Sequence, residues 1–356
     1  MRILIGLSGG VDSSVAAFLL KEQGYEVVGA MMSICQKDKI PIDTEHKNSC
    51  LGTNEQEKID EARKIANQLD IPFHVIDCTQ KYKEIVLNNF KSEYLEGRTP
   101  NPCVWCNAYV KFGVFPELAK ASGIEFDKFA TGHYSKIEEK DGLFYLKKGI
   151  AEKKDQSYFL YRLRQDQLKD IIMPLGGYTK EEIRKIALEN NLLSATKPDS
   201  QDFYAGDYND ILGIKEQIGN IVDSTGKVLG KHKGFWNYTI GQRKGIGIAA
   251  KEPLYVLELN KERNEVIVGF ANETFKNELN ANDINMIIPI EKGTEIEVMA
   301  KIRSTQQPQP AIIYLNEDNT IKTTFKDYQK SIAIGQSIVF YQNDIVLGGG
   351  IIDKIL

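Results

Sequence analysis

Two cysteines three residues apart, Cys103 and Cys106, stand in the stretch NPCVWCN (101–107). A pair with this spacing can be a metal clip, a redox pair or a sulfur-handling site, and the spacing alone does not choose among them. The chain has three more cysteines, Cys35, Cys50 and Cys78, and its start has the pattern of a strand rather than of a secretory signal. An odd number of cysteines in such a chain predicts reduced thiols and a cytoplasmic location.

A second chemical candidate is the glycine- and serine-rich turn SGGVDSS (8–14). The apolar run ILIGL (3–7) before it is typical of a buried parallel strand, and apolar residues recur at the helical period after it. A strand, a flexible turn and a helix start together make an anion site, because free N–H groups and the hydroxyls of Ser8, Ser13 and Ser14 converge there. The turn therefore predicts phosphate binding.

Asp12 lies among these groups that donate hydrogen bonds to phosphate, where a carboxylate would repel a bare anion. Its presence makes sense if a divalent cation bridges it to pyrophosphate. The stretch lacks both the Gly-Lys-Ser/Thr ending of a Walker turn and the G-x-G-x-x-G dinucleotide pattern. It resembles the PP-loop of ATP pyrophosphatases, which split ATP into AMP and pyrophosphate while they adenylate a substrate oxygen.

The surrounding sequence alternates between apolar runs typical of strands and segments of helical period. The expected strands are 26–32, 73–77 and 128–134, and the expected helices lie around 59–69 and 85–94. This alternation predicts an α/β fold with a doubly wound parallel sheet, which binds ligands beyond the carboxyl ends of its strands. All five cysteines then lie on segments that reach that edge. Pro100 and Pro102 are expected to hold the cysteine pair out of helix, with a new helix starting near 110.

Composition and charge limit the class of protein. At 356 residues, 42% hydrophobic and 26% charged, the chain predicts two or three globular domains. No apolar run approaches the roughly 18 residues of a membrane helix, so no membrane partner is expected. The net charge of −4 gives no global attraction to nucleic acid. The stretch 231–244, KHKGFWNYTIGQRK, nevertheless combines basic and aromatic residues in a local face of the kind that contacts phosphates.

Six stretches in order cover nearly the whole chain. They are GLSGGVDSS (6–14), GRTPNPCVWCN (97–107), ATGHY (130–134), KKDQSYFLY (153–161), YTIGQRKGIGI (238–248) and LGGGII (347–352). Together they resemble the bacterial and organellar tRNA 2-thiouridylases, the MnmA family. The resemblance implies a PP-loop ATP-pyrophosphatase domain over 1–200, a central β-rich tRNA-binding domain over 201–280 and a C-terminal β-barrel over 281–356.

The resemblance also implies an ATP-dependent sulfur transfer to tRNA. ATP with Mg²⁺ adenylates O2 of the wobble uridine, a sulfur nucleophile attacks C2, and AMP leaves. By position in the family pattern, the nucleotide contacts Gly6, Leu7, Ser8, Gly9, Gly10, Val11, Asp12, Ser13, Met32 and Gly132. The residues that match contacts to the target base or the tRNA are Asn101, Pro102, Cys103, His133, Lys154, Asp155, Gln156, Arg303, Ser304 and Gln336, and Cys106 matches the nucleophile.

Two departures from the family pattern concern the sulfur. Cys103 stands where the family has an aspartate, and Tyr204 stands where it has the second catalytic cysteine. Three arrangements remain open. Cys103 and Cys106 could hold a 4Fe–4S cluster with Cys50, whose open iron binds sulfide. The pair could instead carry and resolve a persulfide, or belong to a structural zinc, for which the chain has no second C-x-x-C. We expect the cluster.

Other functions fit parts of the sequence. An ATP-dependent ligase that forms amides or amidines would use the PP-loop but leave the cysteine pair, the basic stretch and the barrel without a role. An RNA-binding regulator that has lost catalysis would explain the missing second cysteine, but not the retained Asp12. Thiolation of another RNA is also open. So is the sulfur donor, which could be a cysteine desulfurase, a relay protein or inorganic sulfide.

Overall fold

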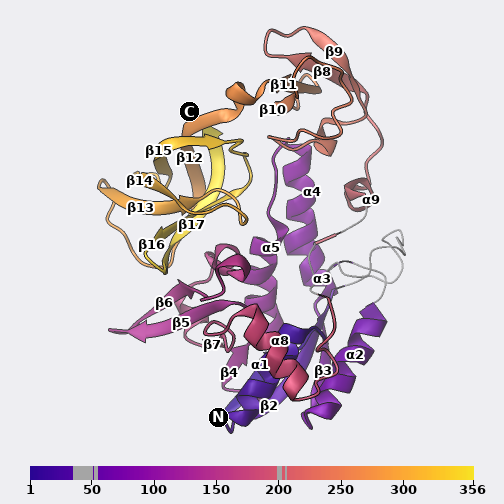
Figure 1. The fold of residues 1–356 in the computed structure, drawn as a ribbon, viewed down its shortest axis with the longest axis vertical. Helices are drawn as coiled ribbons and strands as arrows, with labels where there is room; N and C mark the ends of the chain where they lie inside the picture. The colour runs from indigo at the N-terminus through magenta and orange to yellow at the C-terminus, as the bar shows by residue number, and fades with distance from the viewer. Residues whose placement is uncertain (35–50, 52–54, 199–202, 205–206) are drawn as a thin grey trace. The chain divides into compact units, whose positions relative to one another are not determined.

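The computed structural model describes residues 1–34, 51, 55–198, 203–204 and 207–356 (Figure 1). Within these ranges the chain divides into two compact units. The first unit comprises 1–86, 103–207 and 344–346, and the second comprises 87–102, 208–343 and 347–356. Each unit is therefore built from segments that lie far apart in the sequence.

The first unit contains a five-stranded parallel sheet, which confirms the predicted α/β class. Its strands are β1 (Arg2–Gly6), β2 (Glu26–Ser33), β3 (Phe73–Asp77), β4 (Lys128–Ala130) and β7 (Ile171–Ile172), in the order β3-β2-β1-β4-β7. All of these pairings are parallel. The chain continues from β1 to β2 on one side and later adds β4 on the other, so the strand order reverses between β1 and β4. Ligands bind at such a switch point, beyond the carboxyl ends of the strands.

Helices α1 (Val11–Glu22), α2 (Glu55–Gln68) and α8 (Lys180–Glu189) contribute to the core of this unit. In α1 the buried residues include Val11 and Val15 with the small Ala16 and Ala17, which allow close packing. Each fully buried valine stabilises the fold by about 1.5–3 kcal/mol. Helices α1 and α8 pack against each other (Figure 1). The start of α1 is thereby fixed between β1 and α8.

Two expectations about local structure are wrong. Strand β4 ends at Ala130, so the expected strand 128–134 stops early and residues 131–134 are irregular. The cysteine pair is helical, because α5 (Pro102–Trp105) begins at Pro102 and continues directly into the π-helix η2 (Cys106–Val114). Proline is tolerated at the first helical position, where its missing N–H has no acceptor to lose. The helix expected to start near residue 110 therefore begins earlier, and residue 110 lies within η2.

Shorter elements connect these parts. The segment after β3 forms α3 (Thr79–Tyr82), the π-helix η1 (Lys83–Leu87) and α4 (Asn88–Leu95) in succession, where one helix around 85–94 was expected. The others are α6 (Phe115–Ala121), the hairpin β5 (Ser135–Lys140) and β6 (Leu143–Lys148), η3 (Glu152–Lys154), η4 (Ser157–Leu160) and α7 (Gln165–Leu168).

The second unit contains two β structures. The first is a sheet in the order β10-β11-β8-β9, and the second is a barrel in the order β12-β15-β14-β13-β16-β17, closed by the antiparallel pairing of β12 with β17. The strands of the two structures are β8 (Gly219–Asp223), β9 (Val228–His232), β10 (Tyr255–Asn260), β11 (Glu265–Gly269), β12 (Phe275–Met286), β13 (Glu295–Lys301), β14 (Gln309–Leu315), β15 (Ile321–Lys330), β16 (Ser337–Gln342) and β17 (Ile345–Ile355). The helical segments in this part of the chain are α9 (Tyr208–Leu212), η5 (Phe235–Asn237) and η6 (Ala271–Thr274). The predicted β-barrel is confirmed.

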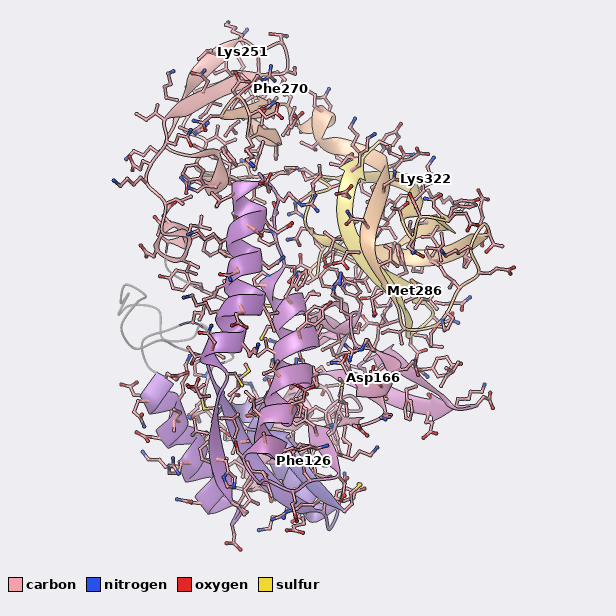
Figure 2. All side chains as sticks on the ribbon, turned by 180° about the vertical axis from the view of Figure 1, so that it is seen from behind. Phe126, Asp166, Lys251, Phe270, Met286 and Lys322 are labelled. Carbon is pink, nitrogen blue, oxygen red and sulfur yellow. The ribbon has the colours of Figure 1, made fainter. Side chains whose placement is uncertain are left out.

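The barrel is filled by residues that alternate along its strands. In β14, Ala311, Ile313 and Leu315 are buried, whereas Ile312 and Tyr314 between them are exposed. Figure 2 labels Lys322 and Met286 on the barrel, and Lys251 and Phe270 at the four-stranded sheet. Side chains of one face of each strand thus form the core.

The aromatic residues of the basic stretch 231–244 are core residues of the second unit. Phe235, Trp236 and Tyr238 are less than one-tenth exposed, and Trp236 Nε1 donates to Asn209 Oδ1 at 2.9 Å. The basic side chains of the stretch, not its rings, therefore lie at the surface. In the described ranges, no helix combines the length and the apolar character needed to cross a membrane.

Candidate active site

The serine-glycine turn lies between the carboxyl end of β1 and the start of α1, at the switch point of the sheet. Gly9 has a φ of +81°, a left-handed conformation that favours glycine. The Ser8 N–H donates to Ser13 Oγ at 3.2 Å, which closes the turn. The first N–H groups of α1 have no acceptor within the helix and carry its positive end. The geometry suits an anion.

Asp12 is held by two side chains from distant segments. The Tyr134 hydroxyl donates to Asp12 Oδ1 at 2.6 Å, and Lys180 Nζ donates to the same oxygen at 2.7 Å. Tyr134 and Lys180 are 2% and 8% exposed. Because both bonds converge on Oδ1, Oδ2 is the oxygen placed to coordinate a divalent cation, and carboxylates are ligands that Mg²⁺ accepts. The sequence carried no signal that links Tyr134 or Lys180 to Asp12.

Gly132 lies against the backbone of the serine-glycine turn. A Cβ at this position would lie 2.8 Å from the Asp12 carbonyl carbon and 2.9 Å from the Ser13 nitrogen, both backbone atoms. Two other residues of the expected nucleotide site, Gly6 and Met32, lie at the carboxyl ends of β1 and β2. The structure therefore brings the expected nucleotide-binding residues to one edge of the sheet.

Gly132→Ala is expected to shift the first turn of α1. Since backbone cannot rotate away as a side chain can, we expect at least about tenfold weaker ATP binding and a loss of about 1–3 kcal/mol in the free energy of unfolding. Calorimetric titration with ATP and urea unfolding measure the two effects.

The matched control is Gly177→Ala, because no heavy atom lies within 4 Å of a Cβ at Gly177. This variant should bind ATP like the wild type and unfold within about 1 kcal/mol of it. Equal effects of the two substitutions would show that contact with the turn is not the cause.

Cys106 begins η2, and packing places η2 at the same sheet edge. Helix α3, which follows β3, packs against η2. Cys78 is the residue after β3, and the Cys106 thiol lies close enough to it to raise the pKa of the Cys78 thiol. At the other end of η2, the rings of Phe112 and His133 have centroids 5.5 Å apart, and His133 follows β4. Strands β3 and β1 are two strand spacings apart, about 10 Å. Cys106 and the serine-glycine turn therefore lie on one rim.

The third described cysteine, Cys78, is unreactive by its surroundings. It is 1% exposed, and burial, followed by the negative charges of Asp77 and Cys106, raises the pKa of its thiol to about 12. A thiol that stays protonated at neutral pH is a poor nucleophile. Cys103 and Cys106 are partly exposed, so sulfur chemistry falls on this pair.

The metal ligands expected from the sequence are only partly visible. Among the residues that the structure describes, no three His, Cys, Asp or Glu side chains form a group that could hold a metal ion. The expected third cluster ligand, Cys50, lies outside the described residues, and so does Cys35. Tyr204, which replaces the second catalytic cysteine, is described and is 7% exposed.

A cluster of rings and a guanidinium borders the cysteine pair. Trp105, between the two cysteines, has its ring centroid 5.2 Å from that of Tyr109, and the Arg162 guanidinium carbon lies 5.2 Å from the Trp105 centroid. Arg162 is 4% exposed. Rings and guanidinium planes are groups on which an unstacked base can lie. The sequence analysis did not single out these three residues, because Arg162 is distant from Trp105 in the sequence and no local pattern connects them.

The segment 154–156 lies beside Tyr134. The Tyr134 N–H donates to Gln156 Oε1 at 2.9 Å, and the Gln156 N–H donates to the Tyr134 carbonyl at 3.2 Å. Asp155 accepts from the Ser157 hydroxyl at 2.8 Å, and Lys154 is exposed. Contact of this segment with tRNA stays a prediction, but its position connects it to Asp12 through Tyr134.

In the second unit, two of the residues expected to contact tRNA, Gln336 and Arg303, donate hydrogen bonds to backbone carbonyls. Gln336 Nε2 donates to the carbonyls of Thr99 and Pro100 at 3.0 and 3.2 Å, and so holds the segment that leads to Asn101 and Pro102. Asn101 is 8% exposed. These bonds give Gln336 a role in placing the segment before Cys103.

Arg303 is similarly engaged. Its Nη2 donates to the carbonyls of Ile240 and Ser331 at 3.1 and 2.9 Å. Arg303 and Ser304 are partly exposed. Their contact with tRNA stays a prediction.

His133 is buried and neutral. Its Nδ1 lies 2.7 Å from Thr131 Oγ1, and burial, with a smaller effect of the Lys111 charge, lowers its pKa well below 6.5. At 8% exposure, the imidazole is covered in this state. Its expected contact with tRNA stays a prediction.

The buried imidazole predicts a pH dependence of stability. Below pH 6.5 the unfolded chain gains a proton at His133 that the folded chain does not bind, so the free energy of unfolding falls by about 1.4 kcal/mol per pH unit until the folded pKa is reached. His133→Asn should make the loss between pH 6.5 and 5.5 smaller by about 1 kcal/mol in urea unfolding. Thr131→Val keeps the imidazole, so the free energy of unfolding should fall with pH as steeply as in the wild type. An unchanged slope in His133→Asn would contradict the assignment.

Three family models match successive parts of the chain. Their descriptions are tRNA methyl transferase HUP domain for residues 1–204, tRNA methyl transferase PRC-barrel domain for 212–270 and aminomethyltransferase beta-barrel domain for 276–352. The three matches follow the order of the parallel sheet, the four-stranded sheet and the barrel.

Curated proteins match over the full length. A tRNA-specific 2-thiouridylase MnmA of Endomicrobium trichonymphae is 52% identical over 99% of both chains. Proteins of the same name from Clostridium botulinum (strain Alaska E43) and Clostridioides difficile are 46% and 43% identical over all of this chain and 98% and 99% of their own. A solved 4-thiouridine synthetase–RNA complex with bound ATP aligns at 15% identity and a TM-score of 0.32, over 55% of this chain and 42% of its own, too weakly to support an inference.

Proposed function

This chain belongs to the MnmA family of tRNA-specific 2-thiouridylases, and we propose that it uses ATP and Mg²⁺ to convert the wobble uridine of tRNA to 2-thiouridine. The observation that supports this most is the packing of η2, which brings Cys106 to the rim of the sheet that carries Asp12. We also propose domain boundaries of 1–200, 201–280 and 281–356.

The first step is adenylation. The uridine O2 attacks the α-phosphorus of ATP, the bond from that phosphorus to the bridging oxygen breaks, and pyrophosphate leaves. The N–H groups at the start of α1 hold the separating phosphates by charge-assisted hydrogen bonds. Asp12 is the ligand for Mg²⁺, which supplies charge neutralisation at the phosphates when bound.

The second step is sulfur transfer. Adenylated O2 is a good leaving group, so a sulfur nucleophile can attack C2. The C2–O2 bond then breaks, and AMP leaves with the oxygen. Trp105, which is partly exposed and has the buried Arg162 guanidinium against its ring, would hold the flipped base beside the cysteine pair.

The sulfur is proposed to come from a site at Cys103 and Cys106. Residues three apart lie on the same side of a helix, with Cβ atoms about 5–6 Å apart. Cys103 and Cys106 stand at this spacing where α5 continues into η2, so both thiolates could bind the same cluster. A 4Fe–4S cluster held by this pair and Cys50 would supply an iron site for sulfide. The alternative is a persulfide on one cysteine that the other resolves, without a cluster.

The iron content of the protein distinguishes the cluster from the persulfide. If the cluster is present, anaerobically purified protein should be brown with about four irons per chain, and Cys50→Ala, Cys103→Ala and Cys106→Ala should each lose the colour. Cys78→Ala is the control and should keep it. A colourless wild type that thiolates tRNA without iron would favour the persulfide.

The function itself is tested by pyrophosphate release from ATP in the presence and absence of tRNA. We expect release only with tRNA, whereas a small-molecule ligase would ignore tRNA and a regulator would release nothing. Mass spectrometry of tRNA nucleosides from cells that lack the gene should show loss of 2-thiouridine at the wobble position. Unchanged levels would contradict tRNA as the substrate and point to another RNA.

A further inference from the structure

Tyr134 links the segment 154–156 to the serine-glycine turn. Its N–H donates to Gln156 Oε1 at 2.9 Å, and its carbonyl accepts from the Gln156 N–H at 3.2 Å. At the other end of the same residue, the hydroxyl donates to Asp12 Oδ1 at 2.6 Å. One residue, only 2% exposed, therefore connects a segment expected to contact tRNA with the carboxylate expected to bind Mg²⁺. The two steps above give this connection no role.

The surface end of the connection is a short segment. Residues 152–154 form the single 3-10 turn η3, and Lys153 and Lys154 are exposed. A 3-10 turn has few hydrogen bonds of poor geometry, so little free energy opposes a shift of this one. Exposed lysines contact the phosphates of a nucleic acid. A tRNA bound at the two lysines would therefore act on Gln156, which follows them closely in the chain.

The hairpin of β5 and β6 makes Tyr134 move with this segment. Tyr134 directly precedes β5 and Gly149 directly follows β6, so the two backbones lie side by side. A Cβ at Gly149 would lie 2.7 Å from the Tyr134 carbonyl oxygen, and the Gly149 N–H donates to Asp155 Oδ1 at 3.3 Å. Together with the two bonds to Gln156, these contacts pass a shift of the segment to Tyr134.

The Tyr134 hydroxyl reduces the charge that Asp12 offers to a cation. Tyr134 and Lys180 donate to the same carboxylate oxygen, and each such bond stabilises the negative charge that a cation would otherwise neutralise. Hydrogen bonds between oxygens extend to about 3.0 Å, so a displacement of Tyr134 by about 1 Å breaks this one. Its loss would leave Asp12 a stronger ligand for a divalent cation.

We propose that Tyr134 is a positioning residue that makes nucleotide binding depend on tRNA. When tRNA binds at Lys153 and Lys154, the segment and Tyr134 shift, the hydroxyl leaves Asp12 Oδ1, and ATP with Mg²⁺ binds more tightly. The hydroxyl keeps its proton, and no covalent bond changes. By linkage, bound nucleotide tightens tRNA binding by the same factor. This role rests on the proposed function, and it favours tight binding of ATP when a uridine is present to be adenylated.

Calorimetric titration with α,β-methylene-ATP and Mg²⁺ tests this role, because the analogue cannot be split between its α- and β-phosphates. The wild type should bind the analogue about fivefold or more tightly when it is saturated with tRNA. Without tRNA, Tyr134→Phe should bind it about 3- to 10-fold more tightly than the wild type, and tRNA should then add less than about twofold. If Tyr134→Phe binds the analogue as weakly as the wild type or more weakly, Tyr134 only supports the turn and the proposal is wrong.

The matched control is Tyr25→Phe. Tyr25 packs against the core of the same unit beyond the far end of α1, a helix of 12 residues and therefore about 18 Å long. This variant should bind the analogue like the wild type and keep the full effect of tRNA. A change equal to that of Tyr134→Phe would show that the bond to Asp12 is not the cause.

Gln156→Ala tests the surface end of the connection. It removes the acceptor of the Tyr134 N–H, so the gain in analogue affinity from saturating tRNA should fall at least about twofold. Tyr134→Phe/Gln156→Ala should bind the analogue as Tyr134→Phe does with and without tRNA, because no hydroxyl remains to be released. A double variant that binds like Gln156→Ala would contradict the proposed order of events.

The outcomes also separate this proposal from the proposed function. If the wild type thiolates tRNA but binds the analogue equally with and without tRNA, only the coupling is wrong. If tRNA is not thiolated, the comparison of Tyr134→Phe with the wild type in the absence of tRNA still decides whether the hydroxyl weakens binding at Asp12. Thermal unfolding checks that each variant is folded. If Tyr134→Phe does not fold, an undiminished tRNA effect in Gln156→Ala would overturn the proposal.

Discussion

Replacing Cys106 with serine is expected to reduce 2-thiouridine formation by about 1,000-fold or more, because a hydroxyl can neither carry sulfur nor bind iron as a thiolate does. The rate of pyrophosphate release in the first turnover with tRNA should change by less than about threefold, since adenylation precedes the sulfur step. Nucleoside mass spectrometry and a pyrophosphate assay on the same reaction measure both steps.

The control for this variant is Cys78→Ala. Cys78 is buried and protonated, with its pKa at about 12, so thiolation should stay within about threefold of the wild type when stability is matched. Thiolation that survives in Cys106→Ser, or that is lost equally in Cys78→Ala, would show that Cys106 is not the sulfur-handling residue.

Replacing Asp12 with asparagine is expected to slow tRNA-dependent pyrophosphate release by about 100- to 1,000-fold at ATP and Mg²⁺ concentrations that saturate the wild type. The amide keeps the shape of the side chain and an oxygen for Tyr134 and Lys180, but it loses the negative charge that holds a divalent cation. Raising the Mg²⁺ concentration should recover part of the rate.

Tyr134→Phe is the matched control. It removes one hydrogen bond from Asp12 Oδ1 and leaves the carboxylate charged, so the rate should fall by no more than about tenfold. If Asp12→Asn retained a rate within threefold of the wild type, the carboxylate would have no part in the chemistry. If Tyr134→Phe were equally slow, the hydrogen bond rather than the charge would be the essential feature.

Contiguous patterns predicted the fold class and the phosphate turn. The apolar run 3–7, the turn 8–14 and the helix after it follow one another directly, so their structure depends mostly on neighbouring residues. Strands alternating with helices likewise predict a parallel sheet, because parallel strands require crossover connections. The rim that collects the ends of β1, β2, β3 and β4 follows from this topology.

Local patterns were less reliable at the cysteine pair. Two prolines near Cys103 suggested an extended loop, but proline disfavours only the helix interior, and Pro102 stands at the first helical position. Whether Pro102 breaks or starts a helix depends on the residues that follow, and these pack into the first unit as η2. The π-helix at Cys106 has no simple sequence signal.

What the sequence determined by itself is the order of the elements, the chemistry of the phosphate turn and the presence of a thiol pair. Only the tertiary structure decided which side chains meet. Lys180 and Tyr134 lie 168 and 122 residues from Asp12, and Gln336 lies 237 residues from Thr99, whose carbonyl it binds. Such pairs are set by strand order and helix packing, in which residues distant along the chain become neighbours, and no local periodicity encodes that proximity.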